Sequence, residues 1–209
     1  MQYKPMLKYL LPFAAYMFVP FIAGLFLADQ YLSYTLKVLI TGGFLLYYIK
    51  DYRELKFRLD FLAIALGIII FIIWIGLEGI YPLLSISSFN PYNLSNVLVI
   101  PMIVIRLIGA VFIASFVEEL FIRSFLIRFF IDTDFEKVPI GKYTFFSFAV
   151  TVLFFGLSHN RWLPGLITGA ILTLLLYKRK NIGSCIIAHA AANLCLGVYV
   201  LATQSWIFW

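Results

Sequence analysis

Long apolar runs that alternate with short polar segments dominate the sequence. Seven runs are expected to form helices, at about residues 7–28, 31–49, 61–77, 97–130, 143–158, 165–177 and 182–203. A helix needs about 20 apolar residues to cross the hydrocarbon core of a bilayer, which is about 30 Å thick. The pattern therefore predicts an all-α integral membrane protein, with about seven transmembrane helices, or eight, in a single bundle.

The composition agrees with this fold class. The chain is 63% hydrophobic and only 12% charged, whereas soluble domains are about 25% charged. We therefore expect one polytopic membrane domain over residues 1–209, without a soluble appendage. Lys4 and Lys8 precede the first apolar run. No cleavage site with small residues follows it, so this run is interpreted as an uncleaved first helix.

The net charge of +6 is explained by membrane topology rather than by nucleic-acid binding. Lys and Arg concentrate between apolar runs, at residues 50–58, 132–142 and 178–180, whereas residues 78–96 contain neither. Basic loops stay on the cytoplasmic side of a membrane. The sequence thus predicts a multi-pass protein of a prokaryotic cell membrane, with its N-terminus in the cytoplasm and its C-terminus outside.

The run at residues 97–130 is too long for one simple crossing. As a helix it would extend roughly 50 Å, well beyond the bilayer core. Arg106 and Arg128 would lie roughly 33 Å apart on that helix, so we expect them to mark the two interfaces by snorkelling. Residues 97–105 would then be interfacial or external, and Glu118 would lie near the midplane.

Between Arg106 and Arg128, three more ionisable residues interrupt this apolar run: Glu118, Glu119 and Arg123. Charges at membrane depth are costly, and they usually mark a functional site. Glu119 and Arg123 have the i, i+4 spacing of a side-chain pair, whereas Glu118 projects about 100° away and has no such partner. A structural ion pair needs one carboxylate. The second carboxylate therefore indicates catalysis.

Both histidines of the chain extend this group. His159 ends one apolar run, and His189 lies one helical turn before Asn193 among small residues. Counted from the neighbouring basic segments, Glu118 and His189 are each roughly 15 Å deep, whereas His159 is roughly 26 Å from Lys142. We expect His159 to join the others only if its helix starts late or tilts.

These groups suit the hydrolysis of a peptide bond by an activated water. A carboxylate and a neutral imidazole can hold and deprotonate a water between them. A histidine N–H and an asparagine amide one turn apart can donate to the oxyanion of a tetrahedral intermediate. No serine of the chain has the G-x-S-x-G setting of a nucleophile. Cys185 and Cys195 lack redox or metal spacing and are interpreted as packing residues.

Three sequence patterns together resemble the motifs of the CPBP (Abi) family of intramembrane proteases. That family includes type II CAAX prenyl endopeptidases and bacterial proteins linked to bacteriocin processing or self-immunity. The motifs occur in the family's order, and the resemblance covers about residues 106–201. The patterns are Glu118-Glu119-x-x-x-Arg123, Phe155-x-x-x-His159 and His189-x-x-x-Asn193.

The resemblance implies a fold, a cavity and a role for each motif residue. It divides the chain into motif-free helices at residues 1–96 and a catalytic core at 97–209, with a cavity open to the cytosol. Ser124 follows the arginine where relatives often have glycine, a departure expected to affect packing. The implied roles are water activation by Glu118 and His159, an oxyanion hole from His189 and Asn193, and support by Glu119 with Arg123.

Other interpretations stay open. Glu118, His159 and His189 could hold zinc with a water as fourth ligand. The chain lacks H-E-x-x-H, and Asn193 suits an oxyanion donor better, so a mechanism without a cofactor is favoured. A non-catalytic scaffold or self-immunity protein would be free to lose motif residues, and a proton-coupled transporter would be expected to show an inverted repeat. The expected partners are the bilayer and a hydrophobic peptide or protein substrate, which reaches the site from the membrane or the cytosol.

Overall fold

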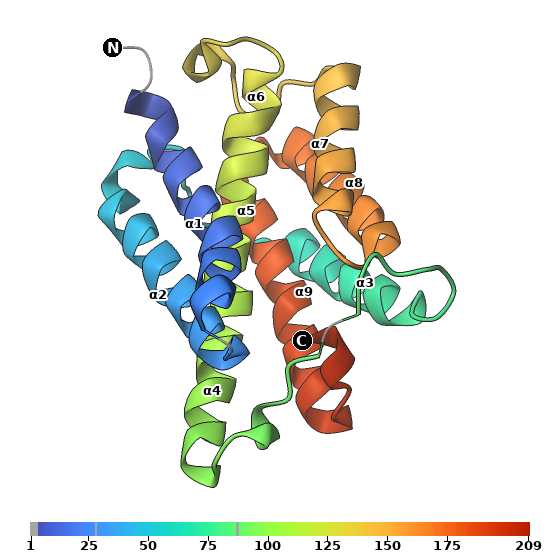
Figure 1. Ribbon diagram of the computed structural model, residues 1–209. Helices are drawn as coiled ribbons and strands as arrows, with labels where there is room; N and C mark the ends of the chain where they lie inside the picture. Colours follow the sequence, from blue (N-terminus) through green and yellow to red (C-terminus); the bar gives the residue numbers. More distant parts are fainter. Residues whose placement is uncertain (1–3, 28, 87) are drawn as a thin grey trace.

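The computed structural model describes residues 4–27, 29–86 and 88–209, and these residues form helices and loops without a β-strand. Each of the seven predicted runs contains a helix, which confirms the all-α class. The last residue of the first predicted run, Ala28, lies outside the described residues. The helices (Figure 1) are α1 (Lys4–Phe26), α2 (Gln30–Tyr47), α3 (Phe61–Gly76), α4–α6 within residues 96–129, α7 (Phe145–Leu157), α8 (Trp162–Arg179) and α9 (Ile182–Thr203).

One continuous helix runs through the centre of the molecule, from Asn96 to Phe129 (Figure 1). It consists of α4 (Asn96–Ile108), α5 (Ser115–Glu119) and α6 (Ile127–Phe129), joined by two π-helical segments, Gly109–Ala114 and Leu120–Leu126. A π turn closes over one residue more than an α turn, and such turns are frequent at functional sites. Here they lie on both sides of the Glu118-Glu119 pair.

The prediction that Arg106 and Arg128 extend into water at two interfaces is wrong. Arg128 is only 7% exposed, and its guanidinium donates to the carbonyl and the hydroxyl of Ser124, one turn earlier. Arg106 packs over the rings of Tyr34 and Phe89, with its Cζ 4.4 and 4.9 Å from the ring centroids. Neither partner could be inferred from the position of an arginine along one helix.

Among the described residues, three helices are long and apolar enough to cross a membrane: Pro5–Phe26, Asn96–Phe129 and Ile182–Thr203. Two further apolar helices, Phe61–Gly76 and Phe145–Leu157, are shorter than a full crossing. The protein is thus an all-helical membrane protein. Its helices α3 and α7 are shorter than a full crossing and pack beside neighbouring helices.

The three basic segments gather at one end of the bundle. Arg53, Lys56, Arg179 and Lys180 line one surface pocket together with Ile140. The start of α1 reaches the same end, since the Tyr52 hydroxyl donates to the carbonyl of Lys8 (2.5 Å) and the Lys8 ammonium lies 3.7 Å from Glu136. This convergence is the arrangement that a positive-inside topology requires.

Asp60 ties α3 to α8 and α9 at this end. Its carboxylate caps α3 and accepts from the Arg179 guanidinium (2.9 Å) and the Ser184 hydroxyl (2.8 Å). Burial by itself raises the pKa of Asp60, but the hydrogen bonds from Ser184 and Arg179 bring the pKa below its usual value. The hydroxyl of Ser184 thus links α9 directly to the carboxylate of Asp60.

Two glycines let the helices that carry the histidines approach their neighbours. A Cβ atom at Gly67 of α3 would lie 2.4 Å from the carbonyl oxygen of Ala188, beside His189. A Cβ atom at Gly165 of α8 would lie 3.1 Å from the backbone of Gly156 in α7. The close packing of α7 and α9 against their neighbours therefore requires residues without a side chain at these two positions.

Candidate active site

The ionisable motif residues divide into a buried cluster and an open pair. The buried cluster centres on Glu119. Its Oε1 accepts from the Arg123 guanidinium at 3.1 Å and lies 2.9 Å from Nδ1 of His189. Glu119 and Arg123 are both 0% exposed. The i, i+4 pair predicted from the sequence is confirmed, and the contact with His189 extends it to α9.

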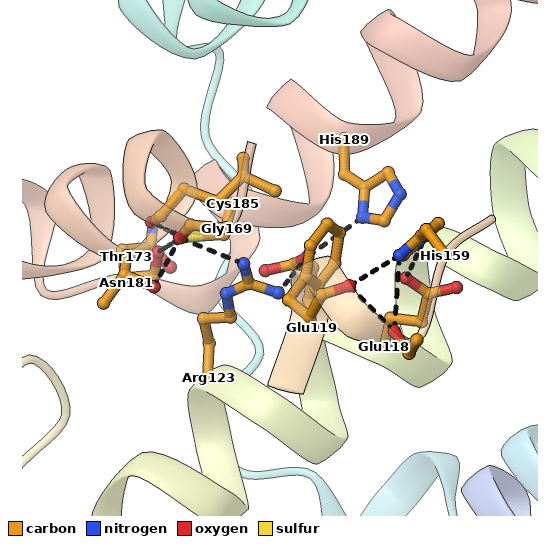
Figure 2. Close-up of polar contacts among 12 residues, drawn as sticks. Glu118, Glu119, Arg123, His159, Gly169, Thr173, Asn181, Cys185 and His189 are labelled. Carbon is orange, nitrogen blue, oxygen red and sulfur yellow. Dashed lines mark hydrogen bonds and ion pairs between the residues drawn. The ribbon is translucent and has the colours of Figure 1, made fainter. Parts of the chain in front are cut away.

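Arg123 continues this cluster into α8. Its guanidinium donates to the carbonyl of Gly169 at 3.3 Å and lies over the ring of Phe155, 4.5 Å from the centroid. Figure 2 shows Arg123 between Glu119 on one side and Gly169 on the other. One arginine thus holds together the central helix, α7, α8 and, through Glu119, α9.

Glu118 lies on a different side of the same helix. It is 6% exposed, and its Oε2 is 3.9 Å from Nε2 of His159 (Figure 2). That oxygen is buried and, within the described residues, has no hydrogen-bond partner. A buried oxygen without a partner is costly unless a solvent molecule or a ligand satisfies it.

His159 reaches Glu118 because α7 is short. The hydroxyl of Thr144 caps this helix, so it begins at Phe145 and ends at Leu157, and His159 lies in the turn that follows. His159 was expected to join the site only if its helix started late or tilted, and the helix does start late. Residues 142–144 are not helical, so a depth counted from Lys142 with a helical rise per residue is too large.

The hydrogen bonds of His159 determine which ring nitrogen faces Glu118 as an acceptor. Nδ1 lies 2.7 Å from the carbonyl oxygen of Phe155, which can only accept. Nδ1 therefore carries the proton, and in the neutral ring Nε2 offers its lone pair toward Glu118. A carboxylate and an imidazole acceptor thus face one another across 3.9 Å.

His189 and Asn193 lie one turn apart on α9 and face the same cavity. Nδ1 of His189 lies 2.9 Å from Oε1 of Glu119, which can only accept, so Nδ1 carries a proton and Nε2 would donate only in the imidazolium form. The amide of Asn193 donates to the carbonyl of Ala110 at 2.7 Å, in the first π-helical segment. This bond uses one of its two N–H groups, and the second remains for a ligand.

Two adjoining cavities meet at Glu118 and His159. The larger, of about 380 Å³, is lined by Glu118, His159, His189 and Asn193, so it contains all four predicted catalytic side chains. The smaller, of about 240 Å³, lies between Glu118, His159 and α1, where it reaches the exposed side chain of Met17. A substrate backbone could therefore pass on either side of the Glu118 carboxylate.

The larger cavity extends away from the basic end of the bundle. Its wall includes Asn160 and Arg161 of the turn before α8 and residues 207–209 at the C-terminal end. The wall at Asn160, Arg161 and residues 207–209 lies at the end of the bundle opposite the basic loops. The cytoplasmic position of the basic loops and the cytosolic opening of the cavity both stay predictions.

Residues 100–195 match the family model described as type II CAAX prenyl endopeptidase Rce1-like. The match spans 96 of the 209 residues, and this part of the chain is similar to that family. The match contains every motif residue from Glu118 to Asn193 and begins six residues before Arg106. No curated protein matches the chain. No solved structure matches it.

The Rce1-like match supports a membrane protease of the CAAX type. The helices before the match nevertheless build the site, because Tyr16 of α1, Lys37 of α2 and Trp74 of α3 line the larger cavity. The sequence analysis treated residues 1–96 as free of motifs and missed these three. Lys37 gave a usable signal, since it is a lone charge within an apolar run.

The zinc interpretation finds little support in the arrangement of its ligands. Within the described part of the chain, no group of three or more His, Cys, Asp or Glu side chains is placed to hold a metal ion. His189 is turned toward Glu119 rather than toward Glu118 and His159. Among the described residues, Glu118, His159 and His189 therefore do not converge on one point as a set of zinc ligands.

Proposed function

We propose that this protein is an intramembrane endopeptidase that cleaves a membrane-associated or hydrophobic peptide with a water activated by Glu118 and His159. One observation carries the proposal. Glu118 of the central helix and His159 of the turn after α7 come from separate motifs and meet at the junction of two cavities, with a buried carboxylate oxygen, unpartnered among the described residues, 3.9 Å from an imidazole nitrogen.

Water fits between these two acceptors. A molecule about 2.8 Å from both atoms would donate one hydrogen to each, at the apex of a triangle whose base is the 3.9 Å separation. Both acceptors then draw protons from the same oxygen and leave its lone pair free to attack. This arrangement uses the Nδ1-protonated form of His159, which the carbonyl of Phe155 selects.

The reaction balances with the groups around the cavity. The water oxygen bonds to the carbonyl carbon of the substrate, one water proton passes to Glu118 or His159, and the carbonyl oxygen becomes an oxyanion. His189 as imidazolium and the second N–H of Asn193 donate to that oxyanion. The C–N bond then breaks, and the proton held by Glu118 or His159 passes to the departing amine.

Cleavage of defined peptides tests this function. Purified wild type in detergent is incubated with an equimolar mixture of apolar peptides, and mass spectrometry identifies the products. We expect cleavage by wild type and by the control variant Lys142→Gln, whose side chain is exposed, and no cleavage by Glu118→Ala. Equal cleavage by the Glu118→Ala protein would exclude Glu118 as the base.

Chelators test the metal-free form of the mechanism. We expect turnover to survive EDTA and phenanthroline, because Glu118 and His159 activate the water directly. Inhibition by phenanthroline that added zinc reverses would instead assign Glu118, His159 and His189 to a metal.

For the orientation, we propose that the basic end is cytoplasmic, so that the cavity opens toward the outer face. Single cysteines are introduced at Lys137, Lys180 and Asn90 in a background without Cys185 and Cys195. We expect only the cysteine at position 90 to react with an impermeant thiol reagent added outside. The reverse labelling pattern would place the cavity toward the cytosol and show that the basic loops are external.

A further inference from the structure

Two adjoining pockets of about 480 and 390 Å³ form a groove at the basic end of the bundle, between the loop that precedes α3 and the turn that joins α8 to α9. The two pockets share the side chains of Arg58, Arg179 and Asn181. We call them together the basic groove. The cations that line it are Arg53, Lys56, Arg58, Arg179 and Lys180.

The carboxylates at the basic groove are bonded to other parts of the protein. Among the described lining residues these carboxylates are Glu54 and Asp60. Oε1 of Glu54 accepts from the hydroxyls of Tyr9 and Ser124, at 2.5 and 2.6 Å. The carboxylate of Asp60 lies 2.9 Å from the guanidinium of Arg179 and neutralises it. Neither carboxylate therefore balances the charge of the other cations of the groove.

Those other cations are exposed and form no ion pair within the described part of the chain: Arg53, Lys56, Arg58 and Lys180. Cations elsewhere at the same end do form ion pairs, since Lys8 lies 3.7 Å from Glu136 and Lys137 lies 2.6 Å from Asp134. A basic loop that only sets the topology needs positive charge, but it does not need to share a pocket with another loop. Four unpaired cations from two loops around one groove indicate a site for an anion.

Close backbone packing fixes the two loops that supply these cations. Lys180 has a left-handed backbone conformation (φ 50°), which turns the chain from α8 into α9. A Cβ atom at Gly141 would lie 3.1 Å from Cγ of Lys180, and one at Gly183 would overlap the carbonyl oxygen of Lys56. The groove is thus formed before an anion binds, which lowers the entropy that binding would cost.

Exposed apolar side chains border the basic groove where α3 begins. Leu59 and Phe61 are each 75% exposed, and both line the 390 Å³ pocket beside Arg58. Phe61 is the first residue of α3, one of the apolar helices of this membrane protein. An acyl chain could cover these side chains while an attached phosphate lies among the cations. A small soluble anion would leave them uncovered, so the groove favours an anionic lipid.

We propose that the basic groove binds the phosphate of an anionic phospholipid, whose acyl chains lie along Leu59, Phe61 and the start of α3. An arginine fork can bind two phosphate oxygens at once, and a lysine adds a point charge. Basic pockets between transmembrane helices bind anionic headgroups in this way. The bound lipid would connect the loop before α3 to the turn between α8 and α9, so it would stabilise the folded protein. The proposal does not rest on the proposed protease function.

Competition between two lipids tests the site. The purified protein in detergent is mixed with equal amounts of phosphatidylglycerol and phosphatidylcholine that carry the same acyl chains, and native mass spectrometry measures which lipid is bound. We expect phosphatidylglycerol to bind at least about 25-fold more tightly, because each of two cations beside an anionic headgroup contributes about fivefold in affinity. Equal occupancy by the two lipids would overturn the proposal.

Substitutions assign this preference to the groove. Arg58→Gln and Lys180→Gln should each lower the preference about fivefold, and the double variant should reduce it to about twofold or less. Arg58→Lys and Lys180→Arg keep the charge and should keep most of the preference. The control Lys142→Gln/Lys178→Gln removes two exposed cations of the same end that do not line the groove. A loss in this control as large as in the groove variants would show a diffuse effect of net charge and overturn the site.

Soluble anions distinguish a lipid from other ligands. Glycerol 3-phosphate carries a phosphate without acyl chains, and decaglutamate carries carboxylates on a peptide. We expect each to bind wild type at least about 100-fold more weakly than phosphatidylglycerol, because Leu59 and Phe61 would stay uncovered. Binding of glycerol 3-phosphate as tight as that of the lipid would assign the groove to a free phosphate. Equally tight binding of decaglutamate would assign it to an acidic segment of a protein.

Thermal unfolding provides a second measurement and checks that the variants fold. Phosphatidylglycerol should raise the unfolding midpoint of wild type above that in phosphatidylcholine, and it should not raise that of Arg58→Gln/Lys180→Gln. In phosphatidylcholine alone we expect the double variant to unfold together with wild type, since exposed substitutions change stability little. An equal rise of the midpoint in both proteins would overturn the assignment to Arg58 and Lys180.

Discussion

Glu118 and Glu119 are chain neighbours in very different surroundings. Each has one buried oxygen without a hydrogen-bond partner among the described residues. The other oxygen of Glu119 contacts both Arg123 and His189, whereas Oε2 of Glu118 lies 3.9 Å from the imidazole of His159. A step of about 100° around one helix therefore separates a carboxylate that is neutralised by neighbours from one that is open to a ligand.

The difference shows how a membrane protein can place a base at depth. An unpaired buried carboxylate is costly. Next to Glu118, the cluster of Glu119, Arg123 and His189 fixes the central helix against α8 and α9. These contacts do not involve Glu118, so they can offset the unfavourable free energy of burying its carboxylate. We accordingly expect changes at Glu118 to affect turnover, and changes at Glu119 to affect stability as well.

The largest expected effect is on turnover at the open pair. Glu118→Gln and His159→Ala should each lower the cleavage rate by about 10²–10⁴-fold, the usual contribution of a general base. Because both residues act on one water, the double variant should be no slower than the slower single variant. The rates are measured on one cleaved peptide under single-turnover conditions. Multiplicative losses in the double variant would show that the two residues act on different steps.

The next effect is on stability at the buried cluster. Arg123→Ala leaves the carboxylate of Glu119 without its closest cation, and breaking a buried pair in this way costs about 3–5 kcal/mol. Glu119→Gln should also lower the midpoint of thermal unfolding in detergent. The double variant Glu119→Gln/Arg123→Gln should recover part of the loss, since neither charge remains alone.

Glu118→Gln is the matched control for that thermal series. It makes the same chemical change one residue away, and we expect its unfolding midpoint to be unchanged or higher, because a carboxylate with an unpartnered buried oxygen is replaced by a neutral amide. A loss of stability as large as that of Glu119→Gln would remove the distinction between the two glutamates.

The smallest effect is expected at the basic end of the central helix. The hydroxyl of Ser124 donates to Glu54 at 2.6 Å, and the same carboxylate oxygen accepts from Tyr9 at 2.5 Å. Ser124→Ala should therefore cost about 1 kcal/mol of stability, the net value of one such bond, with turnover unchanged. In a Glu54→Ala background the same substitution should cost much less. An equal cost in both backgrounds would mean that the bond to Glu54 contributes nothing.

Local patterns in the sequence predicted the helices and one pair of the site. Seven apolar runs became helices, and Glu119–Arg123 followed from i, i+4 spacing, since both features depend on neighbours in the chain. The prediction that His159 could join the site under a stated condition also held, because Thr144 delays the start of α7. These successes required only the geometry of single helices.

The remaining features depend on how helices far apart in the sequence pack. Spacing along α9 could not show that His189 turns toward Glu119, nor could Arg128 be seen to bond Ser124 rather than water. The sequence could not show at which end of the bundle the cavity lies, because a hydropathy pattern locates helices and loops but not the spaces between packed helices. Ser124 was expected to matter for packing and proves to hold a hydrogen bond to a loop 70 residues away.

The two π-helical segments have a consequence for how this helix tolerates changes in length. Each closes its turns over one residue more than an α-helix needs. Phe112, in the first segment, is 56% exposed on the outer side of the bundle. Deleting it would let Gly109–Ala114 relax into ordinary α-helix while the flanking residues keep their angular register. Deleting one residue from an α-helix normally rotates everything beyond it by about 100°. In this segment, before the two glutamates, a one-residue deletion would instead leave the rest of the helix in its original orientation.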